Sequence, residues 1–139
     1  MVDRLLVPMD RSEMAERALR FACEEFPESE ITVLHVVGGP TAYMGEATGI
    51  ALADDPRQAA AELAEPVFER AHEIAAEFDK PVDTAVRLGM ASRAIVNHAA
   101  DFDLVILGSH GRDVSARLLI GNVAETVTRR APVSVVVVR

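Results

Sequence analysis

The chain has 139 residues, 50% of them hydrophobic, with a single cysteine, Cys23, and a formal charge of −8 from 14 basic and 22 acidic residues. This length predicts one domain, residues 1–139, and the hydrophobic fraction excludes a disordered chain. A single cysteine excludes an internal disulfide and a cysteine-based zinc site. The negative charge argues against nucleic acid as a general partner. Because no apolar run approaches the roughly 18 residues of a membrane helix and no signal peptide opens the chain, we expect a cytoplasmic protein without membrane contact.

The N-terminal part of the chain predicts a strand, a helix and a second strand. The apolar run Arg4–Met9 is too short for a helix and has the character of a buried strand. Apolar residues then recur every three or four positions over Ser12–Phe26, which indicates an amphipathic helix that Ser12 or Asp10 could cap. The segment Glu30–Val37 is β-branched and apolar and predicts the second strand.

A long segment without periodicity and a long helix follow. Gly38–Asp55 is a loop of a length that is usually either functional or disordered, so a mobile lid and plain disorder both remain open, although its Ala47–Ala53 stretch could pack locally. Pro56–Phe78 keeps one apolar face and predicts a helix. Pro66 lies inside it without an amide hydrogen, so we expect a kink or a break there.

The rest of the chain predicts three more strands and two more helices. The strands are the largely apolar segments Pro81–Leu88, Asp103–Leu107 and Val133–Val138. Helices are indicated at Ser92–Ala99 and Asn122–Arg130, and the second has two arginines placed favourably at its negative end.

Strands and helices therefore alternate along the chain. This pattern predicts an α/β fold of three layers, α/β/α, in which helices cover both faces of a five-stranded parallel sheet. We expect right-handed crossovers and a doubly wound, Rossmann-like sheet with the usual strand order 3-2-1-4-5. The crevice at the carboxyl ends of the strands, where the strand order reverses, is then the expected ligand site.

The loop after the fourth predicted strand carries the pattern Gly108-x2-Gly111-x9-Gly121-Asn122. The first two glycines let the backbone approach an anion with its amides. The last helix would begin at Gly121-Asn122, with Asn122 as its N-cap, and would offer amides and a positive dipole end to phosphate. Arg112 could add a bidentate contact. The pattern favours a phosphate cradle, although the same glycines could simply make turns and Asn122 could be only a cap.

Five segments spread over the whole chain resemble the universal stress protein family. They are Leu5–Ser12, Ile31–Val37, Gly89–Ile95, Asp103–Gly111 and Ala131–Arg139. The nucleotide-binding branch of that family carries G-x2-G-x9-G followed by Ser or Thr, and this chain keeps the three glycines at that spacing. It departs at Asn122, which puts a hydroxyl contact to phosphate in doubt but not the backbone cradle. The resemblance implies an adenine nucleotide alpha hydrolase-like fold.

The resemblance also implies a crevice site for ATP or another adenine nucleotide, with or without Mg or Mn. Asp10 would accept hydrogen bonds from the ribose, and the backbone of Val36 would pair with the adenine edge. Val123 and Met90 are candidate apolar walls, whereas Leu107 has more the character of ordinary core. The implied nucleotide-binding residues are Pro8, Met9, Asp10, Val36, Leu107, Gly108, Ser109, His110, Gly111, Arg112, Gly121, Asn122 and Val123.

The last predicted strand, Val133–Val138, has apolar groups on both faces and would form a sheet edge. Natural monomers normally protect such an edge, so it favours a symmetric homodimer in which two copies of this strand pair antiparallel. The resemblance implies the same homodimer.

The favoured function is a nucleotide-binding module of stress response or regulation. The alternatives are an enzyme that hydrolyses ATP slowly or transfers its phosphate, and a family member that binds no nucleotide and acts through protein contacts. Asp10 and Asp113 are the loop carboxylates near the expected phosphates, and since no general base is evident, no catalytic residue and no metal ligand is assigned. His35 is expected to be a satisfied, buried histidine, and His110 either a phosphate contact or a solvent-facing side chain.

Thirteen of the 14 basic residues are arginine, and Lys80 is the exception. An acidic, arginine-rich, lysine-poor composition is familiar from salt-loving organisms such as halophilic archaea. A high-GC codon bias would produce the same composition, so both explanations stay open.

Overall fold

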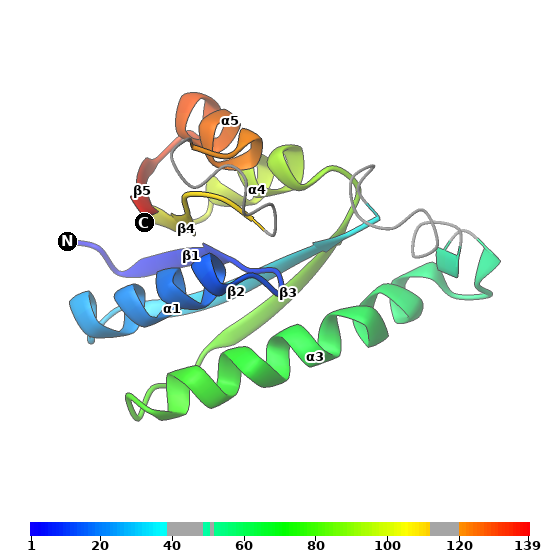
Figure 1. Ribbon diagram of the computed structural model, residues 1–139, viewed down its shortest axis with the longest axis horizontal. Coiled ribbons are helices and arrows are strands. Elements are labelled where there is room, and N and C mark those ends of the chain that lie inside the picture. The colour runs from blue at the N-terminus through cyan, green and yellow to red at the C-terminus, as the bar shows by residue number, and fades with distance from the viewer. Residues whose placement is uncertain (39–48, 51, 112–119) are drawn as a thin grey trace.

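The computed structural model describes residues 1–38, 49–50, 52–111 and 120–139. Within these ranges five strands alternate with four helices (Figure 1). The strands are β1 (Arg4–Pro8), β2 (Glu30–Val37), β3 (Asp83–Leu88), β4 (Leu104–Gly108) and β5 (Ser134–Val138). The helices are α1 (Glu13–Glu25), α3 (Pro56–Ala76), α4 (Ala91–Ala99) and α5 (Asn122–Arg130). Every predicted strand and helix is confirmed, with small shifts at the ends.

The strands form one parallel sheet in the order β3-β2-β1-β4-β5, as predicted. The order reverses at β1, because the chain first moves outward through β2 and β3 and then returns to β4 and β5 on the other side. The side chains of α1 and α3 pack on one face of the sheet and those of α4 and α5 on the other, which makes the three expected layers (Figure 1).

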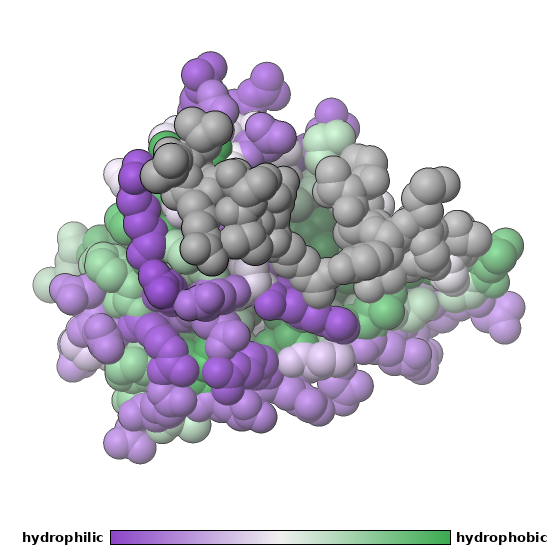
Figure 2. Space-filling view, in the orientation of Figure 1, coloured by the Kyte–Doolittle hydropathy of each residue, from purple (hydrophilic) through white to green (hydrophobic). Residues whose placement is uncertain are grey.

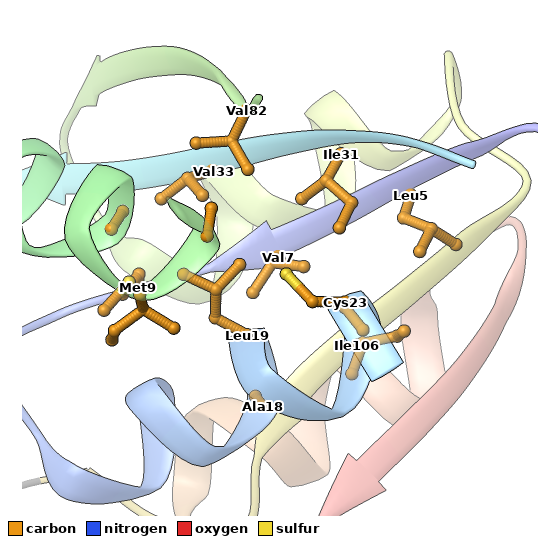
Figure 3. Close-up of a cluster of buried hydrophobic side chains, with 14 of the residues drawn as sticks. Leu5, Val7, Met9, Ala18, Leu19, Cys23, Ile31, Val33, Val82 and Ile106 are labelled. Atoms are coloured by element: carbon orange, nitrogen blue, oxygen red, sulfur yellow. The ribbon is translucent and has the colours of Figure 1, made fainter. Parts of the chain in front are cut away.

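Alternate strand residues fill two separate cores. Leu5 and Val7 of β1 point toward α1 and α3, whereas Leu6 points toward α4 and α5. Figure 3 shows the first core, in which side chains of β1, β2 and β4 meet those of α1. Cys23 lies in this core at 3% exposure, and burial raises the pKa of its thiol. It is therefore a packed thiol.

Helix α3 runs without a break through Pro66, so of the predicted kink or break the break is wrong. Pro66 lies on the exposed side of the helix. The carbonyl of Glu62, which loses its amide partner to the proline ring, can therefore turn to water. The hydrogen bond that the proline removes is therefore lost on the exposed side of the helix, and the buried face stays continuous.

The segment before α3 was expected to be a lid or a disordered loop, and most of it lies outside the described residues. Its described part, Gly49, Ile50 and Leu52, has helical backbone. Ile50 is buried against Val37 and Ala60, which confirms the expected local packing at this residue.

The described surface is strongly charged. In the view of Figure 2 hydrophilic residues cover much of it. Arg20 pairs with Glu77, and Arg70 with Glu16 at 2.7 Å, so ion pairs join α1 to α3. Pairs this exposed add little to the stability of the fold, because water screens them. None of the helices in the described ranges combines the length and apolarity needed to cross a membrane.

The amino-terminal ends of β1 and β4 are joined through one carboxylate. Asp103 Oδ2 accepts the backbone amides of Asp3 and Arg4, both at 2.9 Å, and the Asp103 amide donates to the Arg4 carbonyl at 2.9 Å. The amides of Arg4 and Asp3 hold the pKa of Asp103 below its ordinary value, because they bond to the charged form. The two central strands are thus tied together where their order reverses.

At the other end of β4, Gly108 lies against the first turn of α1. A Cβ at Gly108 would come within 2.8 Å of Met14 Cβ and 2.9 Å of the Met14 carbonyl carbon and oxygen, distances that real Cβ atoms essentially never show. Only glycine lets α1 pack this closely on β4. Gly108 therefore has a packing role, which its place in the glycine motif did not indicate.

Gly108→Ala should lower the free energy of unfolding by about 1–3 kcal/mol, because α1 and β4 must move apart to admit the methyl group. Gly111→Ala is the matched control, since among the described residues a Cβ there would meet Asp10 Oδ2 alone, at 3.4 Å. Urea unfolding followed by circular dichroism measures both variants. Wild-type stability in Gly108→Ala would contradict the packing role.

Asp103→Asn should change how the stability of the protein depends on pH. The folded pKa of Asp103 lies below its unfolded pKa, so the carboxylate stabilises the fold above the unfolded value and loses this effect as the pH falls through the folded value. The variant should therefore melt below the wild type near neutral pH, and the two melting temperatures should converge in acid. Asp83→Asn, an exposed carboxylate at the start of β3, is the control. A difference for Asp103→Asn that persists unchanged in acid would speak against this account.

Candidate functional site

The carboxyl ends of β1 and β4 lie side by side at the point where the strand order reverses. In open parallel sheets this switch point leaves a crevice for ligands, because the chains leaving the two strands go to opposite faces. Here β1 continues into α1 on one face, and β4 leads toward α5 on the other. The predicted site residues that follow these strands are therefore brought to one edge of the sheet.

Asp10 is held at this edge by one of its carboxylate oxygens. Oδ1 accepts the Ser12 amide at 2.8 Å, and Ser12 Oγ accepts the Ala15 amide at 3.2 Å as the N-cap of α1. Of the two predicted caps, Ser12 is thus the one that α1 uses. Asp10 Oδ2 faces the loop that follows β4, where a Cβ on Gly111 would lie 3.4 Å away. A half-buried carboxylate and an exposed glycine therefore face each other across the switch point.

Helix α5 begins next to this pair, and its N-cap is Gly121. The Gly121 amide donates to the Ser109 carbonyl at 2.6 Å, and the Gly121 carbonyl accepts the Glu125 amide at 2.9 Å. The prediction that Asn122 is the N-cap is wrong, because the bond to Ser109 holds Gly121 in the capping conformation and makes Asn122 the first helical residue. In the described part of the chain no side chain caps α5.

The loop after β4 is fastened to its neighbours by Ser109. This residue is 5% exposed, its amide donates to the Val138 carbonyl at 2.8 Å, and its Oγ lies 3.0 Å from His110 Nδ1. A Cβ on Gly121 would lie 3.2 Å from His110 Cα, so α5 starts directly against the loop. His110 is half-buried beside Ser109. The three motif glycines thus each meet a different neighbour, α1, Asp10 and the loop itself.

The end of β1 is tied to β2. Pro8 is paired in register with Leu34, and the next residue, Met9, is 4% exposed and donates its amide to the Leu34 carbonyl at 2.8 Å. The Met9 carbonyl accepts Nδ1–H of His35 at 2.8 Å. His35 is therefore satisfied, as the sequence predicts, but it is half-buried rather than buried. Its contact with the implied binding residue Met9 was missed, because no spacing in the sequence signals it.

Exposed apolar side chains lie at the end of β3 and at the starts of α4 and α5. Met90 and Val123, the predicted walls, are 50% and 40% exposed at the starts of α4 and α5. Leu88 and Ile120, which the sequence reasoning missed, are similarly exposed at 45% and 43%. Leu107 is instead buried in the core beneath α4 and α5, which confirms its core character.

Two predicted groups lie outside the described residues, namely Arg112 and Asp113. Among the residues the structure describes, no three His, Cys, Asp or Glu side chains are placed to hold a metal ion. The described edge offers backbone amides, a carboxylate and apolar side chains. This set suits an organic ligand that carries both an anionic group and hydroxyl groups.

Comparison with known proteins matches these features. The universal stress protein family model covers residues 1–139. A universal stress protein of Mycobacterium tuberculosis is 28% identical over 135 residues, which are 97% of this chain and 45% of that protein. The chain thus spans about half the length of this curated relative. The structure of universal stress protein UspA from Lactobacillus plantarum has a TM-score of 0.76 at 25% identity and covers 99% of this chain and 98% of its own.

Some structural neighbours hold nucleotides. A universal stress protein from Archaeoglobus fulgidus in complex with dAMP has a TM-score of 0.63 at 20% identity, covering 100% of this chain and 98% of its own. A family protein from Arabidopsis thaliana with AMP bound has a TM-score of 0.65 at 12% identity, covering 98% and 90%. Another neighbour is a complex with cAMP. Since the family model matches every residue and the solved members share the fold, this chain belongs to the universal stress protein family.

Proposed function

We propose that this chain binds an adenine nucleotide, ATP, at the carboxyl ends of β1 and β4 and acts as a regulatory module in stress response. The observation that carries the proposal is the position of Asp10. Its Oδ2 faces Gly111 across the switch point, and a Cβ added to Gly111 would lie 3.4 Å from this oxygen. The N-terminus of α5 starts beside them at Gly121. The site thus combines a carboxylate that can accept hydrogen bonds from hydroxyl groups with amides that can donate to phosphate. A nucleotide carries both hydroxyl groups and phosphate.

Each part of the nucleotide has a proposed counterpart. The phosphates would lie at the loop after β4 and the first turn of α5, where Asn122 could donate from its side-chain amide and Arg112 could add a bidentate contact. The ribose hydroxyls would donate to Asp10 Oδ2. The adenine edge would meet the backbone of Val36, whose strand continues beyond the end of β1.

The neighbours with dAMP, AMP and cAMP support the adenine part of the proposal. The proposal goes beyond these neighbours in naming ATP as the nucleotide and in allowing a bound metal ion. If Mg²⁺ or Mn²⁺ accompanies ATP, the phosphates would supply several of its ligands, with Asp10 as a nearby carboxylate. The metal would then neutralise phosphate charge in a site where the described residues supply amides rather than cationic side chains.

Binding rather than turnover is proposed for this site. Hydrolysis requires a group that orients water toward the phosphate. Ser109 is buried, bonded to β5 and paired with His110, and Asp10 already holds the Ser12 amide with one oxygen. The described residues therefore support a holding role better than a catalytic one.

The proposal includes a homodimer through β5. The Val138 carbonyl accepts the Ser109 amide from the β4 side, so by alternation the backbone of Val136 also faces β4 and that of Val135 and Val137 faces outward. In the described sheet β5 is an edge, and its valines are half-buried. An antiparallel copy of this strand would satisfy the outward groups and cover the valines.

Asp10→Asn should weaken AMP and ATP binding about tenfold, because an amide nitrogen at the position of Oδ2 cannot accept the ribose hydroxyls. Asp79→Asn is the matched control, since Asp79 has a φ of 53°, which asparagine adopts readily, and lies between α3 and β3. Isothermal titration calorimetry measures the affinities, and phosphate release during the same incubations reports any hydrolysis. Failure of the wild type to bind either nucleotide at millimolar concentration would defeat the proposal, and unchanged binding in Asp10→Asn would move the site elsewhere.

Substitution by proline at two adjacent positions of β5 separates the dimer from the fold. Val137→Pro removes an outward amide and should give a folded monomer, whereas Val136→Pro removes an amide that faces β4 and should lower the melting temperature further. Sedimentation velocity at micromolar concentration measures the mass. A monomeric wild type, or a dimeric Val137→Pro, would count against this interface.

A further inference from the structure

The ladder between β1 and β2 stops in an unusual way at the crevice. Its last rung is the Met9 amide on the Leu34 carbonyl, at 2.8 Å. In a parallel ladder the next rung would join the Val36 amide to the Met9 carbonyl. Between these described residues that bond is not made. The Met9 carbonyl instead accepts Nδ1–H of His35, at 2.8 Å.

The side chain of His35 reaches this carbonyl from one face of the sheet. His35 alternates with Ile31 and Val33, whose side chains lie in the core under α1 and α3, so its ring lies on that face. Met9 packs in the same core at 4% exposure. The Met9 carbonyl therefore receives its hydrogen bond from a side chain on the α1 face and not from the next rung of the ladder.

The backbone of Val36 is left facing the crevice. The Leu34 carbonyl faces β1, because it accepts the Met9 amide, and the Val37 carbonyl faces β3, because it accepts the Gly89 amide at 2.9 Å. By alternation, the N–H and C=O of Val36 face the β1 side. The register of β1 on β2 ends at Pro8 and Leu34, so this donor and acceptor lie beyond the paired part of β1.

We infer that His35 is a positioning residue, which makes this strand edge selective for adenine by occupying the Met9 carbonyl and so keeping the Val36 amide for the ligand. The inference rests on the proposed function. Adenine presents an acceptor, N1, beside a donor, the N6 amine, and these match the N–H and C=O of Val36. Hypoxanthine presents an N1–H donor beside the O6 acceptor, which would set donor against donor and acceptor against acceptor.

The variant test compares two ligands that differ only at this edge, AMP and IMP. In His35→Leu the Met9 carbonyl loses its donor and competes for the Val36 amide, so AMP affinity should fall about tenfold while IMP affinity stays near its wild-type value. His35→Asn, whose Nδ2 can donate from a position close to that of Nδ1, should restore the preference for AMP. Calorimetry measures the AMP-to-IMP affinity ratio. A purely structural role would weaken both ligands together and leave that ratio unchanged.

A second measurement needs no variant. A carbonyl oxygen can only accept, so Nδ1 of His35 must carry a proton in the free wild-type protein. Nitrogen-15 NMR of the imidazole should find Nδ1 protonated, and hydrogen exchange at the Val36 amide should slow with AMP but not with IMP. A bare Nδ1, or an AMP-to-IMP ratio that His35→Leu leaves intact, would overturn this inference alone. No AMP binding to the wild type would overturn the proposed function and this inference with it.

Discussion

The first turn of α1 crosses the end of β4 with no side chain between them, and the site depends on this contact. Gly108 allows it, since a Cβ there would overlap the Met14 backbone. Because α1 starts from the Asp10–Ser12 turn, the closeness of helix and strand also decides where the Asp10 carboxylate lies relative to Gly111. Interiors packed to crystal-like density transmit such displacements, so a methyl group at Gly108 would be felt at the crevice.

The rest of the site is positioned mainly by backbone hydrogen bonds. Ser109 donates to the Val138 carbonyl and accepts from Gly121, which joins the loop after β4 to β5 and to α5. Met9 donates to Leu34 and joins the end of β1 to β2. Four strands and two helices therefore meet within a few residues at one edge, where the candidate site lies on loops fixed by the scaffold.

The sequence was sufficient for the architecture because its signals are local and repeated. Apolar strands alternate with amphipathic helices, a pattern that is typical of a parallel sheet covered by helices on both faces. The site segments could be predicted for the same reason, since residues that follow β1 and β4 must meet at one edge. Leu107 could be assigned to the core because it belongs to a continuous apolar run.

The features that the sequence did not predict correctly depend on something else, namely contacts between distant parts of the chain. Gly121 replaces Asn122 as the N-cap because Ser109 holds its amide, and nothing near Asn122 in sequence encodes that bond. The packing role of Gly108 requires knowing that Met14 lies above it. Pro66 is tolerated because of the side of α3 on which it falls, which a rule about proline alone does not include.

The glycine cap of α5 has a thermodynamic consequence. A side-chain cap typically stabilises a helix by about 1 kcal/mol relative to alanine, and in the described chain α5 is held at its start by backbone alone. An anion bound at that start would take over the capping role and act on the folded state only. The folded population would then follow ligand concentration through mass action. Since only residues 131–133 separate α5 from β5, the helix that such an anion would stabilise adjoins the edge strand of the described sheet.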